Sequence, residues 1–171
     1  RCGTRVALDV PPGDHLLRNL CHHCGHVQYC NPRTVVGLIP EAADGRILMC
    51  RRATAPGIGL WTFPGGFLES GETSGEGAIR EAREETRAEV ALVGLFMVIN
   101  APSADQIYLI HRGRLWSREY GPTPESSEVA LMREEEIPWR TLAFPSIAVS
   151  LRQYFRDRAH GRYAVHAFDL V

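Results

Sequence analysis

The chain has 171 residues, of which 44% are hydrophobic and 23% are charged, and its formal net charge is −1 at pH 7. This length and composition are typical of one globular domain with a small appendage, and a near-neutral chain without a basic block is not expected to bind nucleic acid. No apolar run approaches the roughly 18 residues of a membrane span and no signal peptide is visible, so we expect a cytoplasmic protein with no membrane partner.

The amino-terminal segment carries a cysteine pattern that the rest of the chain lacks. Cys21 and Cys24 form a C-x-x-C-G knuckle, and Cys2, also followed by glycine, resembles the end of an earlier knuckle. Tetrahedral zinc takes four ligands, which two such knuckles supply as thiolates, and the interval from Cys2 to Cys21 fits a zinc ribbon. We therefore predict a structural Zn²⁺ site in a ribbon over residues 1–32, whose first cysteine would lie ahead of Arg1.

Several alternatives stay open for these cysteines. If the leading cysteine is absent, three thiolates remain, and His22, His23 or His26 is a candidate substitute ligand. A redox-active pair or plain buried thiols would also explain the knuckle, although no thioredoxin-like strand and helix surround it. Cys30 and Cys50 stand alone and are expected to be reduced, packed thiols.

Two short apolar, β-branched runs follow the ribbon, at 34–39 and 47–50. An Asp-Gly pair between them is a hairpin signal, so we predict two antiparallel strands. Arg51 and Arg52 end the second run, just before a glycine-rich loop. They are candidates to bind the phosphate or ribose of a substrate, with a plain surface position as the alternative.

The acidic stretch over 65–88 joins a glycine-rich loop to a helical pattern, which we predict over 72–86 with Thr73 or Ser74 as the N-cap. Three of its glutamates lie within one arc of the helix, clear of the small apolar face that packs. Like charges at these spacings repel, and magnesium prefers carboxylate and phosphate oxygens, so a divalent cation is expected above them. The alternative is a solvated helix whose glutamates pair with its arginines. The three residues are Glu81, Glu84 and Glu85.

The remainder of the chain predicts strands over 89–101, 106–116 and 129–132 and an amphipathic helix over 145–158. Glu125 or Glu128, near the turn before the last strand, is a candidate for a further metal ligand or a general base, with a solvated turn as the alternative. Strands on either side of a central helix, followed by a second helix, describe an α/β domain with a mixed sheet covered on both faces.

The spacing in the acidic stretch resembles the signature of the Nudix hydrolases, G-x5-E-x7-R-E-U-x-E-E-x-G-U, where U is apolar. The fixed positions are occupied by Gly66, Glu72, Arg80, Glu81, Glu84 and Glu85. The glycine near the end of the signature is replaced by Arg87 in this chain. Glycine would serve there as the C-cap of the helix, so the geometry of that turn is expected to differ from the family pattern. With the knuckle and the Leu-Ala-Phe-Pro-Ser run over 142–146, the chain is similar to Nudix enzymes with an amino-terminal ribbon.

The resemblance implies an α/β/α sandwich over 33–171 and a metal-dependent hydrolase of nucleoside diphosphates linked to another moiety. ADP-ribose or FAD is the expected substrate, with AMP released. An NADH pyrophosphatase, a non-catalytic nucleotide-sensing regulator, and an isomerase or cap-hydrolysing enzyme on the same scaffold are the alternatives. A homodimer is expected by family likeness.

The resemblance also implies roles for individual residues. Mg²⁺ or Mn²⁺ would be held by the three clustered glutamates, with Glu72 and the carbonyl of Gly66 nearby. Glu84 is the preferred general base and Glu128 the second choice, while Arg80 would anchor Glu72 by a bidentate pair. Phe144 would pack against the substrate base or against the carboxy-terminal helix.

Overall fold

The computed structural model describes residues 2–116 and 119–170, and the chain divides into two compact units, Arg1–Pro32 and Arg33–Val171. The smaller unit is an antiparallel three-stranded sheet of β1 (Ala7–Asp9), β2 (Arg18–Leu20) and β3 (Val27–Gln28), in that order. Among its described residues the buried hydrophobic side chains are Leu20 and Cys21. Such a small core is a weak source of stability, so a unit of this size depends on cross-links or a metal.

The larger unit is built from an eight-stranded sheet and two α-helices. Its strands are β4 (Arg33–Glu41), β5 (Ile47–Arg52), β6 (Trp61–Thr62), β7 (Gly65–Phe67), β8 (Val90–Ala101), β9 (Gln106–Leu115), β10 (Ser126–Met132) and β11 (His166–Asp169). Its helices are α1 (Ser74–Thr86) and α2 (Pro145–Ala159), with 3-10 turns η1 (Pro102–Ala104), η2 (Glu134–Glu136) and η3 (Trp139–Thr141). No described helix is long and apolar enough to span a membrane.

The sheet is mixed, with the order β10-β5-β4-β9-β8-β11, and β6 and β7 pair with β5 and β4 beside this path. β4 runs parallel to β9 and β8 runs parallel to β11, whereas the other pairs are antiparallel. β11 was not predicted, because four residues at the edge of a sheet carry too short a pattern to stand out from a loop.

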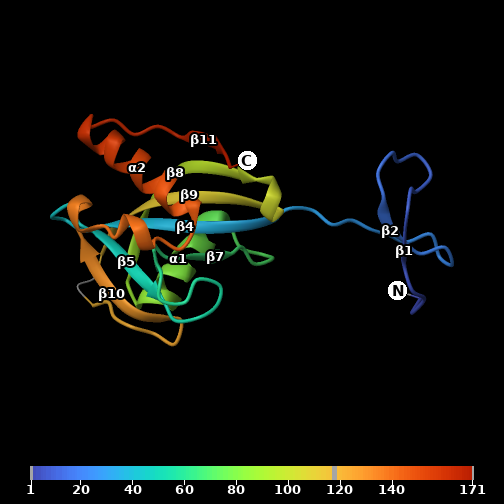
Figure 1. Ribbon diagram of the computed structural model, residues 1–171, viewed down its shortest axis with the longest axis horizontal. Coiled ribbons are helices and arrows are strands. Elements are labelled where there is room, and N and C mark those ends of the chain that lie inside the picture. Colours follow the sequence, from blue (N-terminus) through green and yellow to red (C-terminus); the bar gives the residue numbers. More distant parts are fainter. Residues whose placement is uncertain (1, 117–118, 171) are drawn as a thin grey trace. The chain divides into compact units, whose positions relative to one another are not determined.

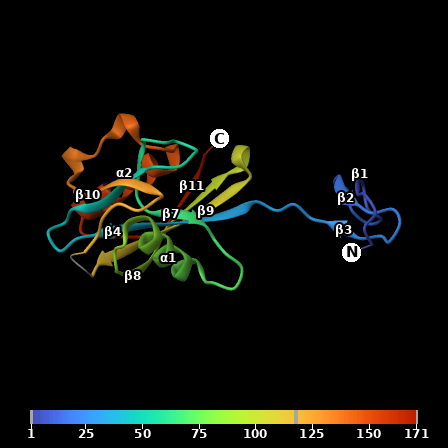
Figure 2. The same ribbon diagram turned by 90° about the horizontal axis from the view of Figure 1, so that it is seen from below.

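Alternation along the central strands divides the core into two layers, because successive strand side chains point to opposite faces. Ile39 belongs to the buried cluster that contains Leu151 of α2, whereas its neighbour Leu38 belongs to the cluster that contains Ala82 of α1. Figure 1 shows the two helices on opposite faces of the sheet, and Figure 2 views the same unit from the side of α1. The predicted α/β/α sandwich is confirmed.

Local sequence signals account for both ends of α1. Thr73 is the N-cap and forms a capping box, in which its hydroxyl accepts from the Glu76 amide at 3.3 Å and the Glu76 carboxylate accepts from the Thr73 amide at 2.8 Å. The helix therefore begins at Ser74, two residues later than predicted. At its other end Arg87 adopts the left-handed conformation, with φ of 61°, and its amide donates to the Arg83 carbonyl at 2.8 Å.

Candidate metal and catalytic site

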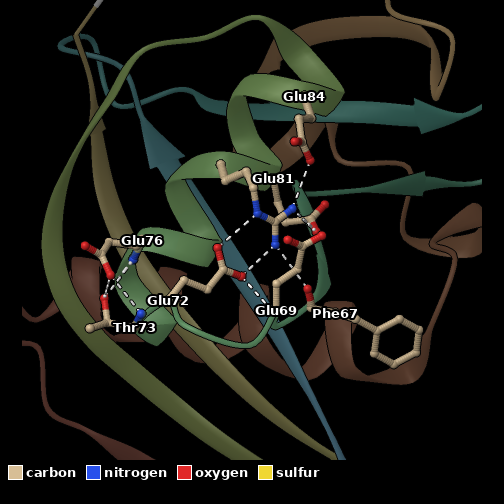
Figure 3. Close-up of polar contacts among 8 residues, drawn as sticks. Phe67, Glu69, Glu72, Thr73, Glu76, Glu81 and Glu84 are labelled. Carbon is tan, nitrogen blue, oxygen red and sulfur yellow. Dashed lines mark hydrogen bonds and ion pairs between the residues drawn. The ribbon is translucent and has the colours of Figure 1, made fainter.

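The Arg80 guanidinium contacts three carboxylates, Glu72 from the loop before α1 and Glu81 and Glu84 from α1 itself. Figure 3 shows these three carboxylates converging. The Nε and Nη2 of Arg80 donate to the two oxygens of Glu72 at 3.0 and 2.8 Å, which is a bidentate pair. Its Nη1 donates to Glu81 at 2.8 Å and to Glu84 at 2.9 Å, and Nη2 also reaches the Phe67 carbonyl at 3.1 Å. The Arg80 guanidinium, with the Glu69 amide, holds the pKa of Glu72 at about 2. Arg80 therefore organises the loop and the helix into one anionic cluster.

Glu85 lies on α1 four positions after Glu81 and joins Glu81 and Glu84 as the third clustered glutamate of the helix. Glu81 and Glu85 are buried, only 8% and 5% exposed. Burial raises the pKa of Glu85 to about 7, against the opposing hydrogen bond that the Gly65 amide donates at 3.0 Å. Burial also raises the pKa of Glu81, which Arg80 partly offsets. A carboxylate withdrawn from water is unfavourable unless it is paired with a positive charge, so this arrangement favours a bound cation.

Glycine is required where β7 passes the helix. A Cβ atom on Gly66 would overlap the Glu81 carboxylate, and one on Gly65 would lie 2.6 Å from the Val36 carbonyl oxygen. β7 pairs with β4 through these residues, so the backbone of Gly66 is held directly against the carboxylate cluster. The glycine pair therefore lets the main chain approach the acidic side chains at contact distance.

A cavity of about 640 Å³ opens beside the cluster. Its lining includes five glutamates together with arginine and aromatic side chains. The glutamates are Glu69, Glu81, Glu84, Glu85 and Glu125. The Arg33 guanidinium lies 4.6 Å from the centre of the Phe67 ring, and the Arg52 guanidinium lies 5.4 Å from that of Phe144. A space lined by acidic, cationic and aromatic groups can hold a cation, a phosphate and a flat ring together.

The structure brings only part of the predicted substrate-binding set to this cavity. Arg52 and Phe144 line it, whereas Arg51 does not: its Nε donates to the Gly59 carbonyl at 2.8 Å, and its Nη1 lies 3.6 Å from Glu128. The reason is strand alternation, since neighbouring residues at the end of β5 point to opposite faces.

Glu128 is likewise outside the cavity, which corrects its prediction as a second choice of general base. β10 begins at Ser126, three residues earlier than predicted, so Glu128 lies within a strand and faces Arg51 across the register. Glu125, on the segment just before that strand, lines the cavity in its place.

Three further residues of the cavity were not indicated by the sequence alone. Arg33, Gln106 and Tyr108 line the cavity although they lie far from the acidic stretch in the chain. The parallel pairing of β4 with β9, in register from Arg33 and Gln106, brings them there. No local pattern reveals a pairing between strands so distant in sequence.

The ribbon unit holds a second cluster of potential ligands. Cys2, Cys21 and Cys24 place their sulfur atoms within 4.8 Å of one another, and the sulfurs of Cys2 and Cys21 are 3.5 Å apart. Hydrogen bonds from Thr4, and then from the two other thiols, lower the pKa of Cys2 to about 6, which favours the thiolate that binds metal. Among the described residues no histidine joins this group. Cys30 is exposed, so its prediction as a packed thiol was wrong.

Two family models match the chain. One is described as the NUDIX domain and matches residues 31–154, and the other is described as Nudix N-terminal, a zinc ribbon, and matches residues 1–30. The ribbon match and the three-cysteine cluster together indicate a zinc site in the smaller unit.

Similar proteins agree with these matches. A crystal structure of a NUDIX hydrolase from Nitrosomonas europaea is 41% identical, with a TM-score of 0.95, and the match covers 99% of this chain and 96% of that one. An ADP-ribose pyrophosphatase of Methanocaldococcus jannaschii is 38% identical over 77 residues, 45% of this chain and 45% of that protein. The NAD-capped RNA hydrolase NudC of Pseudomonas aeruginosa is 30% identical over 129 residues, 75% of this chain and 44% of that protein. The chain thus spans about half the length of these two curated relatives.

Proposed function

The chain belongs to the NUDIX family, and from this membership we propose that it is a metal-dependent pyrophosphohydrolase. Its proposed substrates are nucleoside diphosphates linked to another moiety, with ADP-ribose or FAD cleaved to release AMP. The observation that carries the proposal is the cluster of buried and half-exposed carboxylates in a cavity that arginines and aromatic rings also line.

We propose that Glu81, Glu84 and Glu85 hold Mg²⁺ or Mn²⁺ beside the Gly66 backbone. The residues fit such an ion, because hard divalent cations prefer carboxylate and carbonyl oxygens and two of the three carboxylates are withdrawn from water. When bound, the metal neutralises the diphosphate and lowers the pKa of water. Glu72 already accepts hydrogen bonds from Arg80 and the Glu69 amide, so we assign it to positioning Arg80.

The proton of the attacking water requires an acceptor that can face the cavity. Glu84 is the preferred base, because its side chain is 51% exposed and the described structure gives it a single ion-pair partner, Arg80. Glu125 replaces Glu128 as the second candidate, because it lines the cavity and Glu128 does not. Both carboxylates can accept a proton without breaking the buried part of the cluster.

The arginine and aromatic walls are proposed to bind the two ends of the substrate. The Arg52 Nε donates to the Pro56 carbonyl at 2.7 Å, which fixes the guanidinium at the cavity while its other nitrogens stay available for a phosphate or ribose. Phe144 beneath Arg52, and Phe67 beneath Arg33, offer flat surfaces on which a base can stack.

The test is product analysis with FAD, ADP-ribose, NADH, coenzyme A and diadenosine polyphosphates in the presence of magnesium or manganese. We expect metal-dependent release of AMP, and Glu84→Gln and Glu85→Gln are each expected to slow turnover by roughly 100-fold or more without unfolding the protein. Glu128→Gln is the matched control, because this glutamate lies outside the cavity, and it is expected to retain the wild-type rate.

Two results would reject the proposal. Near-normal rates in both cluster variants would remove the catalytic assignment, and binding of ADP-ribose without any metal-dependent release of AMP would identify a nucleotide-sensing regulator. Preferential cleavage of NADH would instead change the substrate and identify an NADH pyrophosphatase.

A further inference from the structure

We propose that the thiol of Cys50 is a positioning residue for Glu85, fixing which carboxylate oxygen faces the cavity. Nothing in the Nudix signature points to this residue, which lies on β5, 35 positions before Glu85. The inference rests on the proposed function, because it concerns how one carboxylate of the cation site is held.

The Cys50 thiol reaches Glu85 from β5, on the face of the sheet that packs against α1. Along β5, Met49 belongs to the cluster that packs against α2, whereas Leu48 belongs to the cluster that packs against α1. Alternation therefore turns Cys50 toward α1, where it is fully buried. Its sulfur lies 3.8 Å from Glu85 Oε2, within reach of a weak S–H···O hydrogen bond.

Two donors converge on the same oxygen of Glu85. The Gly65 amide of β7 donates to Oε2 at 3.0 Å, and the Cys50 thiol approaches Oε2 from β5. In the described part of the chain no hydrogen bond reaches Oε1, and Glu85 lines the cavity. Since Oε2 is engaged by the main chain and the thiol, Oε1 is the oxygen presented to a cation.

The carboxylate oxygen can only accept, so the thiol is the donor of this contact, and both side chains are buried. A thiol is also a weak donor, so it can orient Oε2 without withdrawing much charge from the carboxylate. An aliphatic side chain of the same size would fill the space but leave Oε2 with the amide alone.

The test compares Cys50→Ala with Cys50→Val in the full chain, by titrating Mn²⁺ and measuring the free ion by electron paramagnetic resonance. Both changes remove the S–H group, but only alanine leaves a cavity. Both are expected to weaken Mn²⁺ binding equally, by about 3-fold, as expected for loss of one weak hydrogen bond. Leu48→Val, on the same face of the same strand and with an apolar side chain that cannot donate a hydrogen bond to Glu85, is the control and is expected to bind as the wild type does.

A second measurement reports on the hydrogen bond itself. The S–H stretching band of Cys50 is obtained as the infrared difference between the wild type and Cys50→Ala, which leaves the four other cysteines unchanged. We expect this band to move to higher frequency in Glu85→Gln, because an amide oxygen is a weaker acceptor than a carboxylate.

Each outcome separates the inference from the function on which it rests. A loss of Mn²⁺ affinity in Cys50→Ala that Cys50→Val does not share would show a packing role. An S–H band whose frequency is unchanged in Glu85→Gln would show that no hydrogen bond exists. Either result overturns the inference alone. If Glu85→Gln leaves Mn²⁺ binding unchanged in the otherwise wild-type chain, the proposed cation site itself fails.

Discussion

The two units of the chain gather anionic side chains in opposite ways. In the larger unit, two hydrophobic clusters bury side chains on both faces of the sheet. Within this packing, Glu81 and Glu85 are also buried. In the ribbon the described hydrophobic core is Leu20 and Cys21, and the sulfur cluster includes one of these two residues. We therefore propose that the fold of the larger unit positions its metal ligands, whereas in the ribbon the metal ligands stabilise the fold.

Removal of zinc is expected to have the largest effect, and to affect the ribbon alone. A strong chelator should unfold the ribbon, because a structural zinc site contributes on the order of 10 kcal/mol to the folding of so small a unit. The larger unit should keep its thermal transition, which amide NMR spectra recorded during the titration can follow separately for each unit. Cys24→Ser should act as the chelator does, whereas Cys30→Ser, outside the cluster, should not. A ribbon that keeps its dispersed spectrum in excess chelator would contradict the comparison.

Gly66→Ala tests whether the fold of the larger unit sets the position of the ligands. The added methyl group would overlap the Glu81 carboxylate and displace it, so we expect kcat/KM to fall by about 100-fold, or about 2.7 kcal/mol, with little change in melting temperature. Gly121→Ala is the matched control, because a Cβ there meets no atom within 4 Å. Equal activities of the two variants would show that contact with Gly66 does not control Glu81.

Arg80→Ala tests whether the guanidinium compensates the negative charge of the acidic cluster. Without the guanidinium, the carboxylates of Glu72, Glu81 and Glu84 lose their partner, and we expect a loss of about 2 kcal/mol in the free energy of unfolding. Magnesium should restore more stability to this variant than to the wild type, since it supplies the missing positive charge. Denaturant titrations with and without magnesium measure both effects.

Arg83→Ala is the control for that experiment. Arg83 lies in the same helix, but its side chain is 71% exposed in its pair with Glu89. Exposed pairs contribute little, so a change of about 0.5 kcal/mol or less is expected. A loss at position 83 as large as that at position 80 would mean that the acidic cluster does not determine the result, because alanine is the better helix former at both positions.

Arg87→Gly gives the smallest expected effect and tests the one departure from the family signature. Arg87 holds the left-handed conformation at the end of α1, which is strained for a residue with a Cβ, so glycine should stabilise the protein by about 0.5–1 kcal/mol. The same substitution four residues earlier, Arg83→Gly, should destabilise by about 1 kcal/mol, because that position is inside the helix. Opposite signs in thermal unfolding would confirm the cap geometry, and a loss of stability at both positions would reject it.

The acidic site was predictable from the sequence to the extent that it is local. The capping signal at Thr73 located the start of α1 to within two residues, and helical spacing placed three glutamates on one arc. The hairpin at Asp44-Gly45 and the helix that became α2 followed in the same way from short-range patterns. Each of these features depends on residues within a few positions of one another, so a linear sequence contains the whole signal.

The choice between neighbouring candidates was decided by tertiary structure. Arg52 and Glu125 line the cavity while Arg51 and Glu128 face each other outside it, and a shift of one residue in strand register would exchange such faces. The sequence by itself determined the family, the acidic helix and the ribbon knuckle, because these are local patterns. Only the pairing of β4 with β9 and of β5 with β10 determined which distant side chains meet the glutamates, because those contacts form between segments that share no local signal.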